Sequence, residues 1–157
     1  MIIMKELIDK FYTGFANLDA ETMASCYHDD IVFHDPAFGE LKGKRAGNMW
    51  RMLCARQKDK NIKVTFNNVV ADDTKGTAHW DAHYIFSKTG RPVHNSIDAS
   101  FQFKDGLIIR HTDVFDLHRW AGMAMGFSGK LLGWTGFFQK KLHTQTNRLL
   151  EKFESKL

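Results

Sequence analysis

The amino-acid sequence predicts one α+β domain in which helices cover one face of a curved, mostly antiparallel sheet. Two patterns carry this prediction. In the first third of the chain, apolar residues recur every three or four positions, which is typical of amphipathic helices. Between residues 63 and 115, apolar and polar residues alternate instead, and turn residues separate the alternating segments. The predicted order is therefore three helices followed by an antiparallel meander.

Three apolar stripes predict the helices. The first covers residues 3–15, and Asp19 is placed to cap a short second helix that continues through Tyr27. The third stripe follows a polar stretch and covers residues 46–54. The stripes consist of Ile3, Leu7, Ile8, Phe11, Tyr12 and Phe15, then Met23, Cys26 and Tyr27, then Ala46, Met49, Trp50, Leu53 and Cys54.

Alternation and turn residues predict the strands. A short strand over residues 31–34 runs into Asp35 and Pro36, where proline removes a ladder donor and ends it. Residues 37–43 are typical of a loop. Four further strands are expected over residues 63–71, 77–87, 93–103 and 107–115, and the short polar segments between them are typical of hairpin turns.

Composition limits the kind of protein this can be. The 157 residues form one ordinary domain, and thirteen Phe and four Trp give more large apolar surface than a minimal core needs. We therefore expect a lined cavity, a subunit interface or both. Cys26 and Cys54 belong to no metal-spaced cluster, so no disulfide framework, metal or cofactor is expected. Residues 1–12 form no long apolar run, which predicts a cytoplasmic protein without an export signal.

The positive charge lies at the end of the chain. Residues 1–118 carry fifteen Lys and Arg against sixteen Asp and Glu, whereas residues 119–157 carry seven against two. Nucleic-acid binding by the main body is therefore not expected. Glycines interrupt the tail, which predicts a short helix, a bend and a final helix. Its basic face suits either a membrane or protein surface, or a solvated face on a helix packed over the pocket or a dimer; we favour the second.

The run from Tyr27 to Pro36, followed by Gly39 and Gly43 ahead of a helix, resembles ketosteroid isomerase. The resemblance covers residues 1 to about 116 and extends to the superfamily of nuclear transport factor two, limonene epoxide hydrolase and the SnoaL-like polyketide cyclases. It implies a cone-shaped domain over residues 1–118, a helical extension over residues 119–157 packed on the same domain, an apolar pocket and a homodimer.

The same resemblance implies candidate catalytic residues. Asp35 corresponds to the base of ketosteroid isomerase, and Asp113 resembles a working aspartate of the cyclases and epoxide hydrolases. The oxyanion-hole positions fall on Phe11 and Ala99, so steroid isomerase activity is not predicted. Asp35 can instead simply cap the turn after its strand, and Asp113 can face outward and pair with a neighbouring basic residue. Both alternatives stay open at this point.

The strand that begins at residue 77 presents two faces. His79, Asp81 and His83 share one face, opposite Trp80 and its apolar neighbours. Burying the Trp80 face costs less, so we expect the histidine face to point outward.

The sequence supports two functions. One is a cofactor-free isomerase, cyclase, dehydratase or hydrolase that acts on a hydrophobic small molecule through aspartate acid–base chemistry; the other is a non-catalytic protein that binds such a ligand. An interaction protein that docks through its basic tail ranks last.

Aromatic residues and one histidine are the candidate ligand contacts. They are Phe11, Tyr12, Tyr27, Trp50, Trp80, Phe101, His111 and Phe115.

Overall fold

A computed structural model describes residues 3–157, and in it six strands form one curved sheet. The strand order is β2-β1-β6-β5-β4-β3, and all neighbours are antiparallel except β1 and β6, which are parallel. The α+β fold class predicted from the sequence is confirmed. The strands are β1 (Tyr27–Asp35), β2 (Gly39–Lys42), β3 (Lys63–Ala71), β4 (Lys75–Phe86), β5 (Arg91–Lys104) and β6 (Leu107–Val114).

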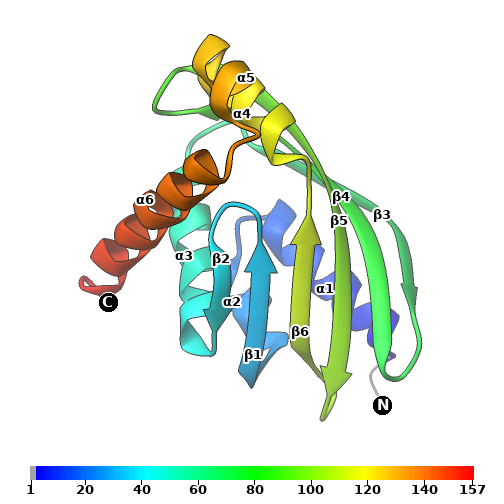
Figure 1. Cartoon of the computed structure of the whole chain (residues 1–157). Helices are drawn as coiled ribbons and strands as arrows, with labels where there is room; N and C mark the ends of the chain where they lie inside the picture. The colour runs from blue at the N-terminus through cyan, green and yellow to red at the C-terminus, as the bar shows by residue number, and fades with distance from the viewer. Residues whose placement is uncertain (1–2) are drawn as a thin grey trace.

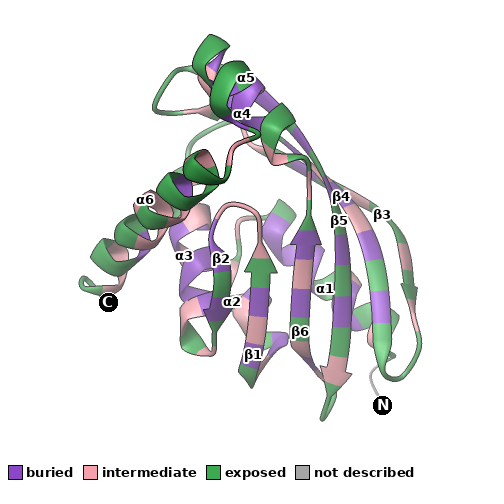
Figure 2. Ribbon diagram, in the orientation of Figure 1, coloured by how far each residue is buried: buried purple, intermediate pink, exposed green. Residues whose placement is uncertain are grey.

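Three helices cover the concave face of the sheet, and three more follow the last strand (Figure 1). Apolar side chains of the first three helices meet the inward-facing positions of the strands and form the main core. Burial alternates along β4 and β5, which appears as banding in Figure 2. The helices are α1 (Met4–Ala16), α2 (Ala20–Ser25), α3 (Lys44–Gln57), α4 (Leu117–Met125), α5 (Phe127–Leu132) and α6 (Gly136–Glu154).

Two predictions, the end of the second helix and the loop over residues 37–43, were wrong because strand pairing overrides the local pattern of apolar residues. The second helix ends at Ser25, not Tyr27, since the carbonyl of Cys26 accepts a bond from the Ile108 amide and Tyr27 pairs with β6. The predicted loop over residues 37–43 contains strand β2, whose Leu41 is buried opposite Phe33 of β1. A four-residue strand with one large apolar side chain gives almost no periodic signal.

The tail contains two short helices before the long one, where the sequence predicted a single short helix. Trp120, Ala121 and Ala124 of α4 pack with Val93 of β5 and Leu142 of α6 in a second apolar cluster. Several other large side chains of α5, the turn after it and the start of α6 are exposed, among them Phe127, Leu131, Trp134 and Phe137. Along residues 3–157, no helix is both long enough and apolar enough to cross a membrane.

Candidate functional site

A cavity of about 720 Å³ lies between the concave face of the sheet and helices α3 and α6. Its volume falls in the range of small-molecule sites. Apolar and aromatic side chains form most of its wall, including Phe15, Trp50, Trp80 and Phe115. The two candidate carboxylates, Asp35 and Asp113, are its only acidic lining residues within the described chain.

Asp35 is the last residue of β1, and its carboxylate both caps a turn and faces the cavity. Its Oδ1 accepts bonds from the amides of Ala37 at 3.0 Å and Phe38 at 2.6 Å, so the side chain closes an Asx turn after Pro36. Its Oδ2 accepts no bond from residues 3–157 and is free for a ligand. The Asp35 side chain therefore caps the turn with one oxygen and faces the cavity with the other.

Asp113 lies beside Asp35 across two parallel strands. The β1–β6 register pairs Phe33 with His111 and His34 with Thr112. Continuing this register by one residue places Asp35 next to Asp113 on the concave face, where strands are spaced about 4.8 Å apart. Asp113 is 2% exposed. The alternative in which Asp113 faces outward is wrong.

A buried chain of hydrogen bonds holds Asp113. The indole N–H of Trp50 donates to the hydroxyl oxygen of Tyr27 at 2.8 Å, and that hydroxyl lies 2.8 Å from Nδ1 of His111. Nε2 of His111 lies 2.9 Å from Oδ1 of Asp113, and the indole of Trp80 donates to the same oxygen at 3.4 Å. Four side chains therefore support one carboxylate oxygen, directly or in sequence.

Donor chemistry fixes one direction in this chain. An indole nitrogen can only donate, so the Tyr27 oxygen accepts from Trp50. The directions of the Tyr27–His111 and His111–Asp113 bonds follow the tautomer of the imidazole. Burial raises the pKa of the Tyr27 hydroxyl well above its usual value, although the Trp50 bond opposes this, so the hydroxyl keeps its proton.

Asp35 has the opposite environment. Desolvation by burial, reinforced by the nearby Asp113 charge, raises the pKa of Asp35 from 3.8 to about 7, although the Phe38 and Ala37 amide bonds oppose the shift. A carboxyl group with this pKa takes up and releases a proton near neutral pH. Two neighbouring carboxylates with different support can divide acid and base roles, as pairs of this kind do in enzymes.

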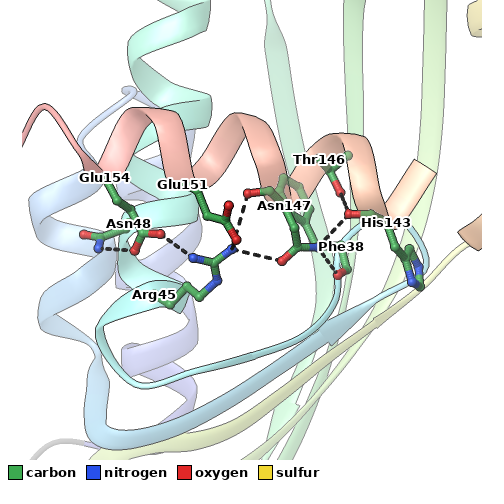
Figure 3. Close-up of polar contacts among 8 residues, drawn as sticks. All are labelled: Phe38, Arg45, Asn48, His143, Thr146, Asn147, Glu151 and Glu154. Carbon is green, nitrogen blue, oxygen red and sulfur yellow. Dashed lines mark hydrogen bonds and ion pairs between the residues drawn. The ribbon is translucent and has the colours of Figure 1, made fainter. Parts of the chain in front are cut away.

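Helix α6 covers the Asp35 turn (Figure 3). His143 lies 2.8 Å from the Pro36 carbonyl, Thr146 donates to the Ala37 carbonyl at 2.9 Å, and Asn147 donates to the Phe38 carbonyl at 2.9 Å. These three donors are spaced at i, i+3 and i+4 and therefore share one face of the helix. The backbone carbonyls of the turn thus accept hydrogen bonds from α6, and two backbone amides of the same turn donate to Asp35.

Polar contacts to α3 anchor the end of α6. Arg45 forms an ion pair with Glu154 and donates to the Asn147 side chain at 3.1 Å, and Asn48 donates to Glu154 at 2.9 Å (Figure 3). Sequence patterns did not identify these pairs, because each joins residues far apart in the chain.

The predicted ligand contacts fall into two groups. Trp50, Trp80 and Phe115 line the cavity. The other five pack behind this wall, where five aromatic rings surround the His111 imidazole at centroid distances of 4.5–6.2 Å. They support the wall and the Asp113 chain without lining the cavity; they are Phe11, Tyr12, Tyr27, Phe101 and His111.

Further cavity residues were absent from the predicted contacts. Asn95 is 8% exposed and lines the cavity, and its amide has no hydrogen-bond partner within the described chain, so it is free to donate to a ligand. Tyr84 also lines it and accepts a bond from Trp120 at 2.8 Å. Alternation along the sequence left two possible faces of β5 for Asn95. In the structure Asn95 lies on the buried face, together with the other buried residues of β5. Leu142 and Thr146 of α6 complete the wall.

The histidine face of β4 points away from the cavity, as predicted. His79 lies 2.8 Å from Asp98 and 3.1 Å from Asp81, which also binds His94 at 3.0 Å. Asp98 raises the pKa of His79 through a hydrogen bond. Asp98 and His34 are exposed, so neither belongs to the cavity, whereas Ala99 and Phe11 are buried.

A family model described as the SnoaL-like domain matches residues 8–111, which is more than half of the chain. A candidate polyketide cyclase from Xanthomonas campestris pv. campestris has 21% sequence identity and a TM-score of 0.60, over 75% of this chain and 93% of the other. An epoxide hydrolase from M. tuberculosis, described as LEH-like, has 21% identity and a TM-score of 0.61, over 83% and 92%.

A third solved structure shows the same fold at lower identity. It is a protein with a ketosteroid isomerase-like fold from Catenulispora acidiphila DSM 44928, in complex with trimethylamine, with 13% identity and a TM-score of 0.62, over 76% of this chain and 92% of the other. A comparison with proteins of curated function found no match. The structural likenesses show the fold, and the homodimer predicted from the sequence stays a prediction.

Proposed function

The chain belongs to the SnoaL-like domain family, and we propose that it is a cofactor-free enzyme that moves protons on a hydrophobic small molecule. The observation that carries the proposal is the pair of neighbouring carboxylates on the cavity wall, one supported by a buried histidine and one with its pKa raised to about 7. The reaction classes that fit are isomerisation, cyclisation, dehydration and hydrolysis.

In this proposal Asp35 carries the proton and Asp113 orients the substrate. Ionised Asp35 removes a proton from a substrate carbon or from a water molecule through its free Oδ2 and returns it from the same oxygen. Asp113, held by His111 and Trp80 beside Asp35, orients the substrate on the cavity wall. The Asn95 amide can donate to a carbonyl or hydroxyl oxygen.

We also propose that residues 119–157 form an extension that closes the cavity of the domain over residues 1–118. Its helix α6 supplies Leu142 and Thr146 to the wall and holds the Asp35 turn. In this role the extension excludes water from Asp35, which is the condition that raises the pKa of a carboxyl group.

Cleavage of nitrobenzisoxazole tests the proposal without knowledge of the natural substrate. A base removes its ring C–H proton while the N–O bond breaks, and the coloured cyanonitrophenolate is released. We expect the rate to rise with pH and level off above about 7, because the ionised form of Asp35 is the base. Asp35→Asn should lower the rate by about 100-fold or more.

Asp29→Asn is the matched control, because Asp29 is an exposed aspartate on the same strand. An unchanged rate in Asp35→Asn would remove Asp35 from the mechanism. If the wild-type protein binds the neutral dye N-phenylnaphthylamine but does not accelerate cleavage, the non-catalytic binding function is favoured instead.

A further inference from the structure

Four cationic side chains line the outer part of the cavity. They come from three separate segments: Arg56 and Lys60 from the end of α3 and the residues after it, Lys88 from the β4–β5 hairpin, and Arg148 from α6. We call them the cationic rim. All four are exposed, and none forms an ion pair or side-chain hydrogen bond with any residue from 3 to 157.

The rim lacks a compensating acid. The acidic residues that line the cavity, Asp35 and Asp113, are the two candidate catalytic groups of the concave face, and they are less exposed than the rim. The described chain carries almost as many acidic as basic residues, so a wholly cationic rim is not a consequence of composition. Charges of one sign beside a cavity with apolar walls attract ions of the opposite sign.

We infer that the cavity takes an anionic amphiphile, with its negative group on the cationic rim and its apolar part directed inward. The inference rests on the proposed function, since it takes the cavity to be the ligand site. An apolar chain or ring system matches the wall formed by Trp50, Trp80 and Phe115. A carboxylate, sulfate or phosphate group matches the rim, because it relieves the repulsion among four like charges.

The charges of the site also fix the direction of binding. An anionic group that moved inward would lose its hydration and approach the carboxyl groups of Asp35 and Asp113. At the rim it keeps contact with water and meets cations. The substrate atoms that reach Asp35 therefore belong to the apolar part, remote from the anionic group. This excludes chemistry at the carbon that carries the anionic group.

Binding of dodecanoate and dodecanol separates the contributions of charge and chain. The two ligands share a chain length and differ in the charged group, and each can displace the neutral dye N-phenylnaphthylamine from the cavity. We expect dodecanoate to bind at least about tenfold more tightly than dodecanol, and this preference to shrink as salt is added.

Substitutions in the rim locate the charged group. Arg56→Gln and Arg148→Gln should each weaken dodecanoate binding about threefold, and about tenfold together, while dodecanol binding stays within twofold. Arg119→Gln is the matched control, because Arg119 is an exposed arginine of the extension that does not line the cavity. Equal binding of both ligands, or an equal effect of the control substitution, would overturn the inference.

The outcome of the binding experiment can be separated from the outcome of the cleavage experiment that tests the proposed function. Asp35→Asn should bind dodecanoate at least as tightly as the wild type, whether or not the protein catalyses proton transfer. Conversely, acceleration of nitrobenzisoxazole cleavage by the wild-type protein tests the proposed function, whichever of the two ligands binds more tightly. Loss of the anion preference with cleavage intact would therefore contradict the ligand class alone.

Discussion

The two cavity carboxylates have the same chemistry and neighbouring positions but different support. Asp113 lies within β6, where His111 and Trp80 contact its Oδ1 from the buried side. Asp35 lies at the end of β1, where two backbone amides bind its Oδ1 and α6 covers the turn from outside. Side-chain partners inside the core hold Asp113, while desolvation without a cationic partner raises the pKa of Asp35 to about 7.

The largest expected effect lies on the Asp113 side. In His111→Leu the Tyr27 hydroxyl and the Asp113 carboxylate both lose their buried partner. We expect the free energy of unfolding to fall by about 3–5 kcal/mol, measured by urea denaturation. His34→Leu, at an exposed histidine on the adjacent strand, should change it by less than about 0.5 kcal/mol. A small loss in His111→Leu would mean that the buried chain does not hold Asp113.

The next effect lies on the Asp35 side and depends on pH. The pKa of Asp35 is raised in the folded state to about 7, so the folded state holds this proton more tightly than the unfolded chain. Stability from this group is complete below pH 4 or so and is lost as pH rises to about 7. One pKa unit corresponds to about 1.4 kcal/mol, so a rise from 3.8 to about 7 corresponds to a loss of roughly 4 kcal/mol.

Asp35→Asn removes this pH dependence. The Asn side-chain oxygen can still accept the Ala37 and Phe38 amide bonds, so the turn is retained. Urea denaturation at pH 5 and pH 8 should therefore show that the free energy of unfolding of the variant, relative to that of the wild type, is higher at pH 8. Asp29→Asn is the control. A constant difference between Asp35→Asn and wild type across this range would show that the pKa of Asp35 is not raised.

The smallest effect concerns the outer cover of Asp35. Thr146→Val removes the hydrogen bond to the Ala37 carbonyl with little change in shape. We expect a loss of about 1 kcal/mol in stability and a fall in the pKa of Asp35, because a loosened helix admits water. Carboxyl-carbon NMR titration measures this pKa. Thr144→Val, at an exposed threonine of α6 that bonds only within its own helix, is the control and should leave the pKa of Asp35 unchanged.

The local sequence was sufficient for several features of the site. Alternation predicted that Trp80 faces inward and His79 outward, and that His111, Asp113 and Phe115 share one face of the last strand. Pro36 after Asp35 predicted the end of the strand and the turn that Asp35 caps. These features depend on residues next to one another, and periodicity records them directly.

The sequence by itself thus determined the helices, the long strands and the side of each strand that is buried. Only the tertiary structure decided which distant segments meet. The parallel pairing of β1 with β6 places Asp35 beside Asp113, and the docking of α6 joins Arg148 to Arg56 on one cavity. Local periodicity carries no information about strand partners or about where a helix docks, because these depend on burying apolar surface across the whole chain. The support of each carboxylate was therefore visible only in the fold.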